Sequence, residues 1–231
     1  MKKMLLAALL MAALLLCVPA IAEETAAVKV GDIITYGVYE QDNNLENGKE
    51  PLEWRVLAAE GDELLLITLY GIDCVPYNTE GGYARWRTAS LRTWLSTEFY
   101  NTVFTDEERA GIITKEVINW REKPSTDPVI LLSTDEAKRL FANHADRQCT
   151  PTAYAVAQGA YTSVKFHKDP NGPANCHWWL RTHSWENNYK GTYVAASGGV
   201  MTCGGHKDGF ANNDKLTIRP SIYLSASALA E

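Results

Sequence analysis

Short strand segments separated by turn signals dominate this sequence. Residues 30–39 are rich in β-branched and aromatic side chains, and residues 54–58 and 64–69 flank Glu60-Gly61-Asp62 in a pattern typical of a β-hairpin. Asn47-Gly48 marks a second sharp turn. Further strands are predicted at residues 129–132, 177–181, 192–196, 199–202 and 216–224. These segments predict a β-rich fold.

Helices are predicted between the strands. Apolar side chains at positions 91, 94, 95 and 99 recur at helical spacing, so one face of this segment is expected to contact the core. Thr105 with Glu108, and Ser133 with Glu136, have the spacing of capping boxes that begin helices. Residues 152–158 predict a further short helix, with Pro151 in its first position. Strands and helices together indicate the α+β class.

The first 22 residues have the pattern of a cleavable secretory signal. Lys2 and Lys3 precede an apolar run over residues 4–18, and Ala20-Ile21-Ala22 offers small side chains around a cleavage point. The run is shorter than the roughly 20 residues that a membrane-spanning helix needs. An uncleaved anchor and a lipidated Cys17 are the alternatives; the first lacks a basic flank, and the second has Leu16 where a small residue is usual.

Residues 23–231 are interpreted as one secreted or cell-envelope domain, because no repeat or flexible linker divides them. Loss of two lysines with the leader would change the formal net charge from −6 to −8. An acidic surface without a basic tract argues against nucleic acid as a partner. No later apolar stretch is long enough to predict membrane insertion after cleavage.

Four cysteines follow the leader, at Cys74, Cys149, Cys176 and Cys203. Export permits disulfides, but sequence alone leaves all three pairings open. At most one bridge is expected, with Cys74 the least favoured partner. Cys203-x-x-His206 has the spacing of a zinc ligand pair, yet the adjacent Cys176 and His177 would point apart on a strand, so neither a metal site nor a cofactor is predicted.

No catalytic residue is predicted. Ser197-Gly198-Gly199 lacks the strand-to-helix context of a nucleophile elbow, and the paired glycines do not form a phosphate-binding motif. Glu46, Glu50 and Glu53 lie in polar segments, where solvation explains them.

Exposed aromatic side chains are the strongest chemical signal. Long polar loops at residues 182–191 and 203–215 are candidates for binding, because long loops on a small sheet are usually functional. Aromatic rings there can stack on a sugar or enter a partner's pocket, or else pack the loop against the domain. The predicted ligand-binding residues are His183, Trp185, Asn187, Tyr189 and Tyr193.

Several segments carry a resemblance to a known family. They are residues 31–44, 48–57, 90–108, 146–161, 176–182 (CHWWLRT) and 216–224 (LTIRPSIYL). In order along the chain, they resemble a bacterial family known only as a domain of unknown function, family 6273. The ending of that family in turn looks like the C-type-lectin-like fold, which formylglycine-generating enzymes share. The resemblance implies a twisted antiparallel sheet, flanking helices and a long-loop region, with Trp179 and Arg181 structural and Arg181 buried near Arg219.

The chain also departs from these relatives. His183 follows Thr182 where the family usually continues with proline and glycine. Residues 169–171 and 212–214 are loose echoes of lectin calcium motifs, so no calcium ligands are transferred, and the reactive cysteines of the formylglycine enzyme have no counterpart in the loops. A secreted, non-enzymatic module that binds a glycan or a protein is therefore expected. An enzyme with a cysteine or metal centre and a structural envelope domain are the alternatives.

Overall fold

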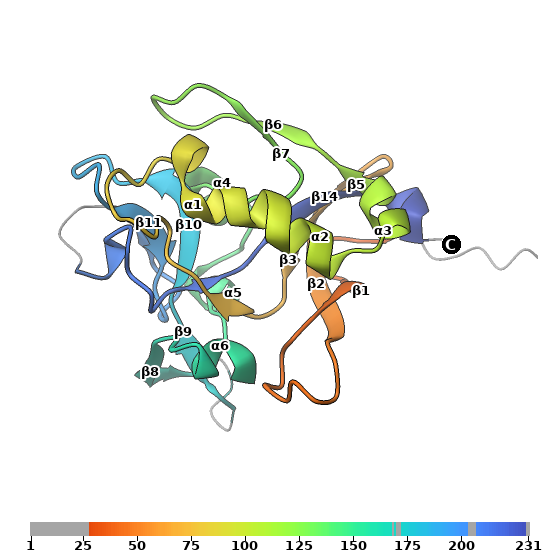
Figure 1. Cartoon of the computed structure of the whole chain (residues 1–231), viewed down its shortest axis with the longest axis horizontal. Helices are drawn as coiled ribbons and strands as arrows, with labels where there is room; N and C mark the ends of the chain where they lie inside the picture. The colour runs from red at the N-terminus through yellow and green to blue at the C-terminus, as the bar shows by residue number, and fades with distance from the viewer. Residues whose placement is uncertain (1–27, 168, 170–171, 203–206, 230–231) are drawn as a thin grey trace, which may run out of the picture.

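The computed structural model describes residues 28–167, 169, 172–202 and 207–229 (Figure 1). The predicted secretory signal at residues 1–22, Cys203 and His206 lie outside these ranges. The described chain is a mixed α+β structure in which strands are more abundant than helices and pair mostly antiparallel. No helix within these ranges is long and apolar enough to cross a membrane.

One five-stranded antiparallel sheet joins segments from both halves of the chain. Its strands, in spatial order, are β1 (Ile33–Tyr39), β2 (Glu50–Glu60), β3 (Glu63–Thr68), β14 (Ser221–Ser225) and β5 (Ile112–Ile113). The predicted β2–β3 hairpin is confirmed, and Gly61 takes the positive φ of 60° that its tight turn requires. Ile34 and Ile222 therefore belong to the same sheet, although two strands separate them.

The central strand β3 explains why this sheet holds two cores. Successive side chains of a strand point to opposite faces. Leu64 and Leu66 accordingly pack in the larger core with Trp54, whereas Leu65 and Ile67 pack in a second core with Trp178. When a strand is covered on both faces, its sequence is a continuous apolar run and does not alternate between apolar and polar residues.

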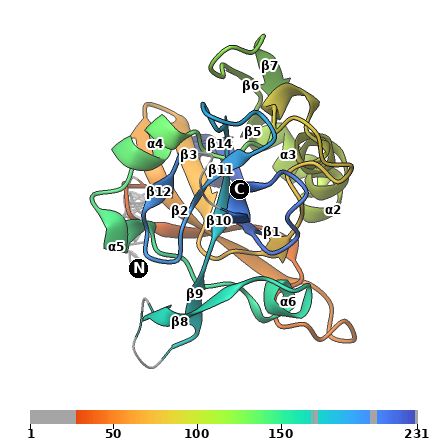
Figure 2. The same ribbon diagram turned by 90° about the vertical axis from the view of Figure 1, so that its left-hand side faces the viewer.

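A second sheet carries the candidate site. Its strands, in spatial order, are β12 (Val200–Met201), β11 (Gly191–Val194), β10 (Trp178–His183), β13 (Thr217–Ile218) and β4 (Asp73–Cys74). Trp178 and Thr217 pair in parallel, and the other strand pairs are antiparallel. Figure 2 shows β10 and β11 in front of the first sheet.

The strand predicted at residues 216–224 is instead two strands in different sheets. The chain changes sheets at Arg219-Pro220, where proline offers no N–H for a ladder. Buried Arg219 donates hydrogen bonds from Nε and Nη2 to the carbonyl of Thr68, at 3.0 and 2.8 Å. The Arg219 guanidinium, at the break between β13 and β14, thus holds this segment against β3 of the first sheet.

The predicted helices form, with local corrections. The helix expected around residues 91–99 runs through α1 (Ser90–Trp94), η2 (Leu95–Phe99) and α2 (Tyr100–Val103), and crosses the front of Figure 1. Leu91, Leu95 and Phe99 are fully buried as the spacing predicts, and Trp94 is half-buried.

Both capping boxes are confirmed, at the starts of α3 (Asp106–Gly111) and α4 (Thr134–Arg139). The short helix α6 (Ala153–Ala157) also exists, but Thr152 is its N-cap, so Pro151 precedes the cap and does not occupy the first helical position. Another short helix, α5 (His144–Arg147), had no sequence prediction.

The segment at residues 129–132 is buried but is not a strand. Only Ile130 forms a bridge, to Ser221 of β14, because Pro128 and the capping residue Ser133 limit the extended stretch on either side.

Two small hairpins complete the fold, with the remaining short 3-10 turns. They are β6 (Lys115–Val117) with β7 (Ser125–Asp127) and β8 (Thr162–His167) with β9 (Ala174–Cys176); the turns are η1 (Trp86–Thr88), η3 (Lys207–Gly209) and η4 (Ala226–Leu229).

Candidate functional site

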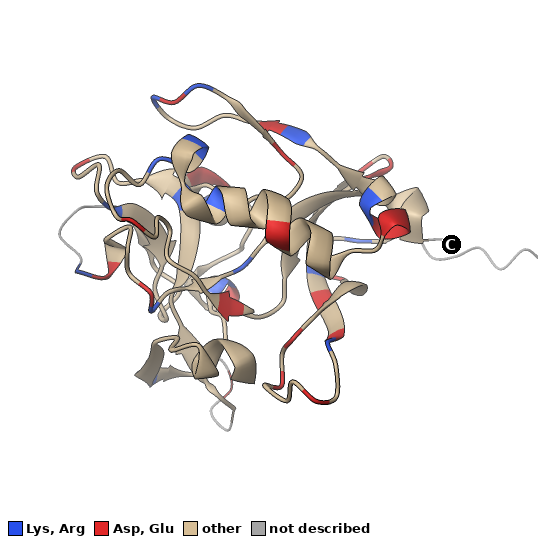
Figure 3. Cartoon of the chain, viewed as in Figure 1, with Lys and Arg blue, Asp and Glu red and all other residues tan. Residues whose placement is uncertain are grey.

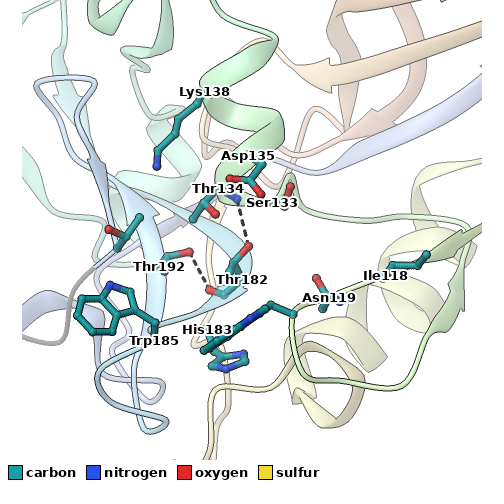
Figure 4. Close-up of a pocket in the computed structure, with 12 residues that line it drawn as sticks. Ile118, Asn119, Ser133, Thr134, Asp135, Lys138, Thr182, His183, Trp185 and Thr192 are labelled. Carbon is teal, nitrogen blue, oxygen red and sulfur yellow. Dashed lines mark hydrogen bonds between the residues drawn. The ribbon is translucent and has the colours of Figure 1, made fainter.

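The strand β10 positions the site through its last residues. Thr182 joins three elements, because its Oγ1 accepts a hydrogen bond from the Thr134 N–H of α4 at 3.1 Å. Its carbonyl accepts another from Thr192 Oγ1 of β11 at 2.7 Å. Figure 4 shows both bonds and the hollow that they border. The start of α4 and the strands β10 and β11 are therefore held together at Thr182.

Arg181 anchors the wall behind this hollow. Its guanidinium is buried and forms a two-point ion pair with Glu136 of α4. Arg181 Nε also donates to Asn119 Oδ1 at 3.1 Å, and Nη1 donates to the Leu131 carbonyl at 2.9 Å. Bidentate arginine–carboxylate pairs fix orientation as well as contributing energy, so this arginine locks α4 and Asn119 against β10.

The charge of Glu136 follows from the same contacts. Burial alone would raise the pKa of Glu136, but the hydrogen bond and positive charge of Arg181 outweigh burial and lower it. Glu136 is therefore a carboxylate at neutral pH. The capping box that begins α4 uses the same side chain, since its Oε2 accepts from the Ser133 N–H at 2.7 Å.

A second buried pair supports the other side of the hollow. His183 Nδ1 lies 3.2 Å from Glu122 Oε1, and both side chains are almost fully buried. Burial would raise the pKa of Glu122, yet its hydrogen bonds to His183 and to the backbone N–H of Arg87 lower it. The ring of Trp120 stacks on His183 with centroids 5.6 Å apart.

The backbone beside Trp120 is strained. Arg121 has a φ of +58°, a left-handed conformation that residues with a branched or long side chain rarely adopt. Its guanidinium lies over the Trp120 ring, 4.2 Å from the centroid. Strained residues that the surrounding structure holds in place are often found at ligand sites.

These elements enclose a pocket of about 440 Å³, within the range of small-molecule sites. Its lining combines two indoles with hydroxyl, amide and charged groups. The lining residues are Ile118, Asn119, Trp120, Ser133, Thr134, Asp135, Lys138, Thr182, His183, Trp185, Thr192 and Thr202. Trp120 and Trp185 are 48% and 64% exposed, although His183 and Arg121 both lie against the Trp120 ring. Figure 4 shows Lys138 and Trp185 at separate edges of the pocket.

Two of the five predicted ligand-binding residues, His183 and Trp185, line this pocket. The other three do not. Tyr193 is buried between Trp179 and His177, and Asn187 holds its own loop by accepting the Tyr189 N–H at 2.9 Å. Tyr189 stacks on Tyr83 outside the pocket, with centroids 5.1 Å apart.

The sequence did not predict the pocket residues that come from α4 and from the segment before it. Asn119 and Trp120 lie between β6 and β7, and Asp135 and Lys138 lie on α4. The capping box located the helix, but no local signal shows that α4 faces β10. The only sequence signal at Trp120 was that it is an aromatic residue.

Cysteine and metal chemistry have few candidates in the described part of the chain. Cys74, Cys149 and Cys176 are thiols there, and none of them lines the pocket. Burial raises the pKa of the Cys74 thiol to about 12. Among described residues, the one group of three or more candidate metal ligands is Glu40, Asp42 and Glu50, at the β1–β2 turn.

A family model described as "Domain of unknown function (DUF6273)" matches residues 61–226, most of the chain and all of the elements around the pocket. The chain belongs to this family. The match begins at the β2–β3 turn, so the resembling segments at residues 31–44 and 48–57 lie outside it. No curated protein and no solved structure matches this DUF6273 chain.

Proposed function

We propose that this DUF6273 domain binds an oligosaccharide in the pocket between α4, β10 and residues 118–120. The observation that carries the proposal is the presence of two exposed indoles, Trp120 and Trp185, around one cavity lined with hydroxyl and charged groups.

The chemistry of a sugar suits such a lining. A pyranose ring has an apolar C–H face that an indole can cover, and a rim of hydroxyls that need donors and acceptors. Thr134 and Thr182 offer hydroxyls, and Asp135 and Lys138 add a carboxylate acceptor and an ammonium donor. A few placed polar groups beside apolar surface are typical of ligand pockets.

The pocket is also well prepared for binding. The pairs Arg181–Glu136 and His183–Glu122 are buried and hold the walls together. Because the walls are fixed before the ligand arrives, less conformational entropy is lost on binding. Binding a sugar needs no catalytic group, so the proposed function is recognition of the ligand and not catalysis.

A protein ligand is the second candidate, and a different surface favours it. Tyr83 and Tyr189 are both about half-exposed and stacked, and the Arg85 guanidinium lies 5.5 Å from the Tyr83 centroid. Tyrosine and arginine are enriched at the energetic centres of protein interfaces. This surface contains one of the predicted binding residues, Tyr189.

Export and a C-type-lectin-like fold are part of the same proposal. An acidic domain that follows a secretory leader would meet glycans of a cell envelope or surroundings. Two further functions compete with it: an enzyme on a formylglycine-generating-enzyme-like scaffold and a structural envelope domain. The first would rely on Cys203 and His206, outside the described residues.

A glycan array followed by calorimetry on the best hit tests the proposal. W185A and W120A are each expected to weaken binding at least tenfold, about 1.4 kcal/mol. Y189A is the matched control, an exposed aromatic outside the pocket that should keep full affinity.

The outcomes separate the candidates. Loss of binding in Y189A but not in W185A would replace the pocket with the Tyr83–Tyr189 surface. An array without hits, together with pull-downs from envelope fractions that capture nothing, would support a structural domain and refute the binding proposal.

A further inference from the structure

Three carboxylates meet at the turn that joins β1 to β2, far from the pocket in sequence. One oxygen from each of Glu40, Asp42 and Glu50 lies within 4.8 Å of the other two. Glu40 directly follows β1, and Glu50 is the first residue of β2. Figure 3 shows acidic segments gathered along this turn. Like charges so close repel each other unless a positive charge lies between them.

No side chain in the described ranges supplies that charge. None of the salt bridges formed there includes Glu40, Asp42 or Glu50. Lys49 is adjacent in sequence, but its Nζ donates to the Thr102 carbonyl at 2.8 Å. Glu50 Oε2 receives only neutral donors, from the backbone N–H of Gln41 at 2.7 Å and that of Asp42 at 3.4 Å.

Glu40 gives independent evidence for a missing ligand. One of its carboxylate oxygens lies in the cluster, the residue is 8% exposed, and its Oε1 is buried with no hydrogen-bond partner among the described groups. A buried carboxylate oxygen without a partner is costly, so native proteins pair such atoms or use them to coordinate metals. Glu40 Oε1 is thus a buried acceptor with no donor among the described groups.

Asp42 is held ready as a ligand. Asp42 Oδ2 accepts a hydrogen bond from Asn47 Nδ2 at 2.8 Å, and Oδ1 accepts one from the Asn44 N–H at 2.7 Å. The same bonds orient both of its oxygens within the turn. Asp42 is exposed, which leaves the cluster open to solvent on one side.

We propose that Glu40, Asp42 and Glu50 bind one Ca²⁺, which ties the end of β1 to the start of β2. All three ligands are hard carboxylates, with no imidazole or thiolate to favour zinc or copper. Ca²⁺ accepts six to eight oxygens in a flexible arrangement and takes waters to complete its shell, whereas Mg²⁺ demands near-ideal octahedral geometry. The site lies outside residues 61–226 and does not depend on the proposed glycan pocket.

Calorimetric titration of the purified chain with Ca²⁺, paired with thermal unfolding in Ca²⁺ and in EDTA, tests this site. One Ca²⁺ per chain is expected, with a Kd on the order of 10⁻⁴–10⁻³ M as in other extracellular sites, and a higher Tm when Ca²⁺ is present. E50Q keeps an oxygen to accept from the Gln41 N–H, and D42N keeps one of the two acceptor oxygens of Asp42; each should weaken binding at least tenfold. E46Q, an exposed glutamate of the same turn outside the cluster, is the matched control and should bind as the unchanged chain does.

Several results would overturn the assignment. Absence of both heat and a Tm shift at about tenfold above that Kd range would refute the site. Equal losses in E46Q and D42N would show only diffuse attraction to an acidic surface. Binding of Mg²⁺ as tight as that of Ca²⁺ would refute the choice of ion.

Discussion

Glu136 beside the pocket and Glu40 at the β1–β2 turn are both shielded carboxylates, but their surroundings differ. Glu136 meets both terminal nitrogens of Arg181 and the N–H of its own helix cap. Glu40 has a buried oxygen without a partner and two further carboxylates nearby. The pocket wall therefore contains its own compensating charge, whereas the turn needs a charge from solution.

The difference predicts opposite responses to loss of charge. Neutralising a group in the pocket wall leaves a buried charge unpaired and destabilises the fold. Neutralising a group in the turn removes repulsion and stabilises it.

The largest effect is expected for R181M. Removing one partner of a buried ion pair typically costs about 3–5 kcal/mol, here because Glu136 and the Leu131 carbonyl both lose their donor. Urea unfolding should show a lower midpoint. R139M, on the exposed side of α4, should keep a free energy of unfolding within about 0.5 kcal/mol of that of the unchanged chain. An equal loss of stability in R181M and R139M would show that the buried ion pair has no special role.

Lowering the pH should produce a smaller loss of stability, through His177 and Glu136. The pKa of His177 is lowered by burial, against the nearby charge of Asp208, so the unfolded chain takes up this proton first. Stability is then complete above the ordinary value of 6.5 and falls as the pH drops toward the folded pKa. Glu136, whose pKa is also lowered, adds a second decline below its ordinary value of 4.5.

Chemical unfolding measured from pH 8 to about pH 3, roughly the span of these transitions, checks this prediction. H177Q should remove the first decline, because no imidazole is left to take up the proton. H144Q, at an exposed position, should keep it. A decline that H144Q abolishes and H177Q preserves would contradict the assignment.

E40Q should act in the opposite direction and raise stability by about 1 kcal/mol in EDTA. The substitution removes a shielded charge and gives the cluster a donor, so repulsion with Asp42 and Glu50 weakens. The same variant should lose the increase in Tm that Ca²⁺ gives. A lower Tm for E40Q in EDTA would show that the carboxylate is already compensated.

The smallest effect on folding is expected for W185A. Its ring is 64% exposed, so truncation should change the free energy of unfolding by no more than about 0.5 kcal/mol. Thermal unfolding with and without a bound glycan would separate the two roles. A large loss without ligand would mean that Trp185 supports the fold.

Local signals in the sequence predicted much of the framework. The β2–β3 hairpin and the caps at Thr105 and Ser133 depend on residues within a few positions of one another. The break at Pro220 was missed because the apolar pattern of residues 216–224 continues across it, while the two halves pair with different sheets.

The candidate site was less accessible to sequence reasoning. The capping box identified the local bond of Glu136, but its pairing with Arg181 spans 45 positions. His183 and Trp185 were predicted from a loop rich in polar and aromatic residues, whereas Trp120 reaches the same pocket from a separate hairpin. Such convergence depends on tertiary packing, which no short motif encodes.

The place of β14 between β3 and β5 has a consequence for biosynthesis. Residues 221–225 are made long after residues 63–68, so β3 must leave the ribosome with one hydrogen-bonding edge open and its leucines uncovered. The first sheet cannot close until this late strand is added.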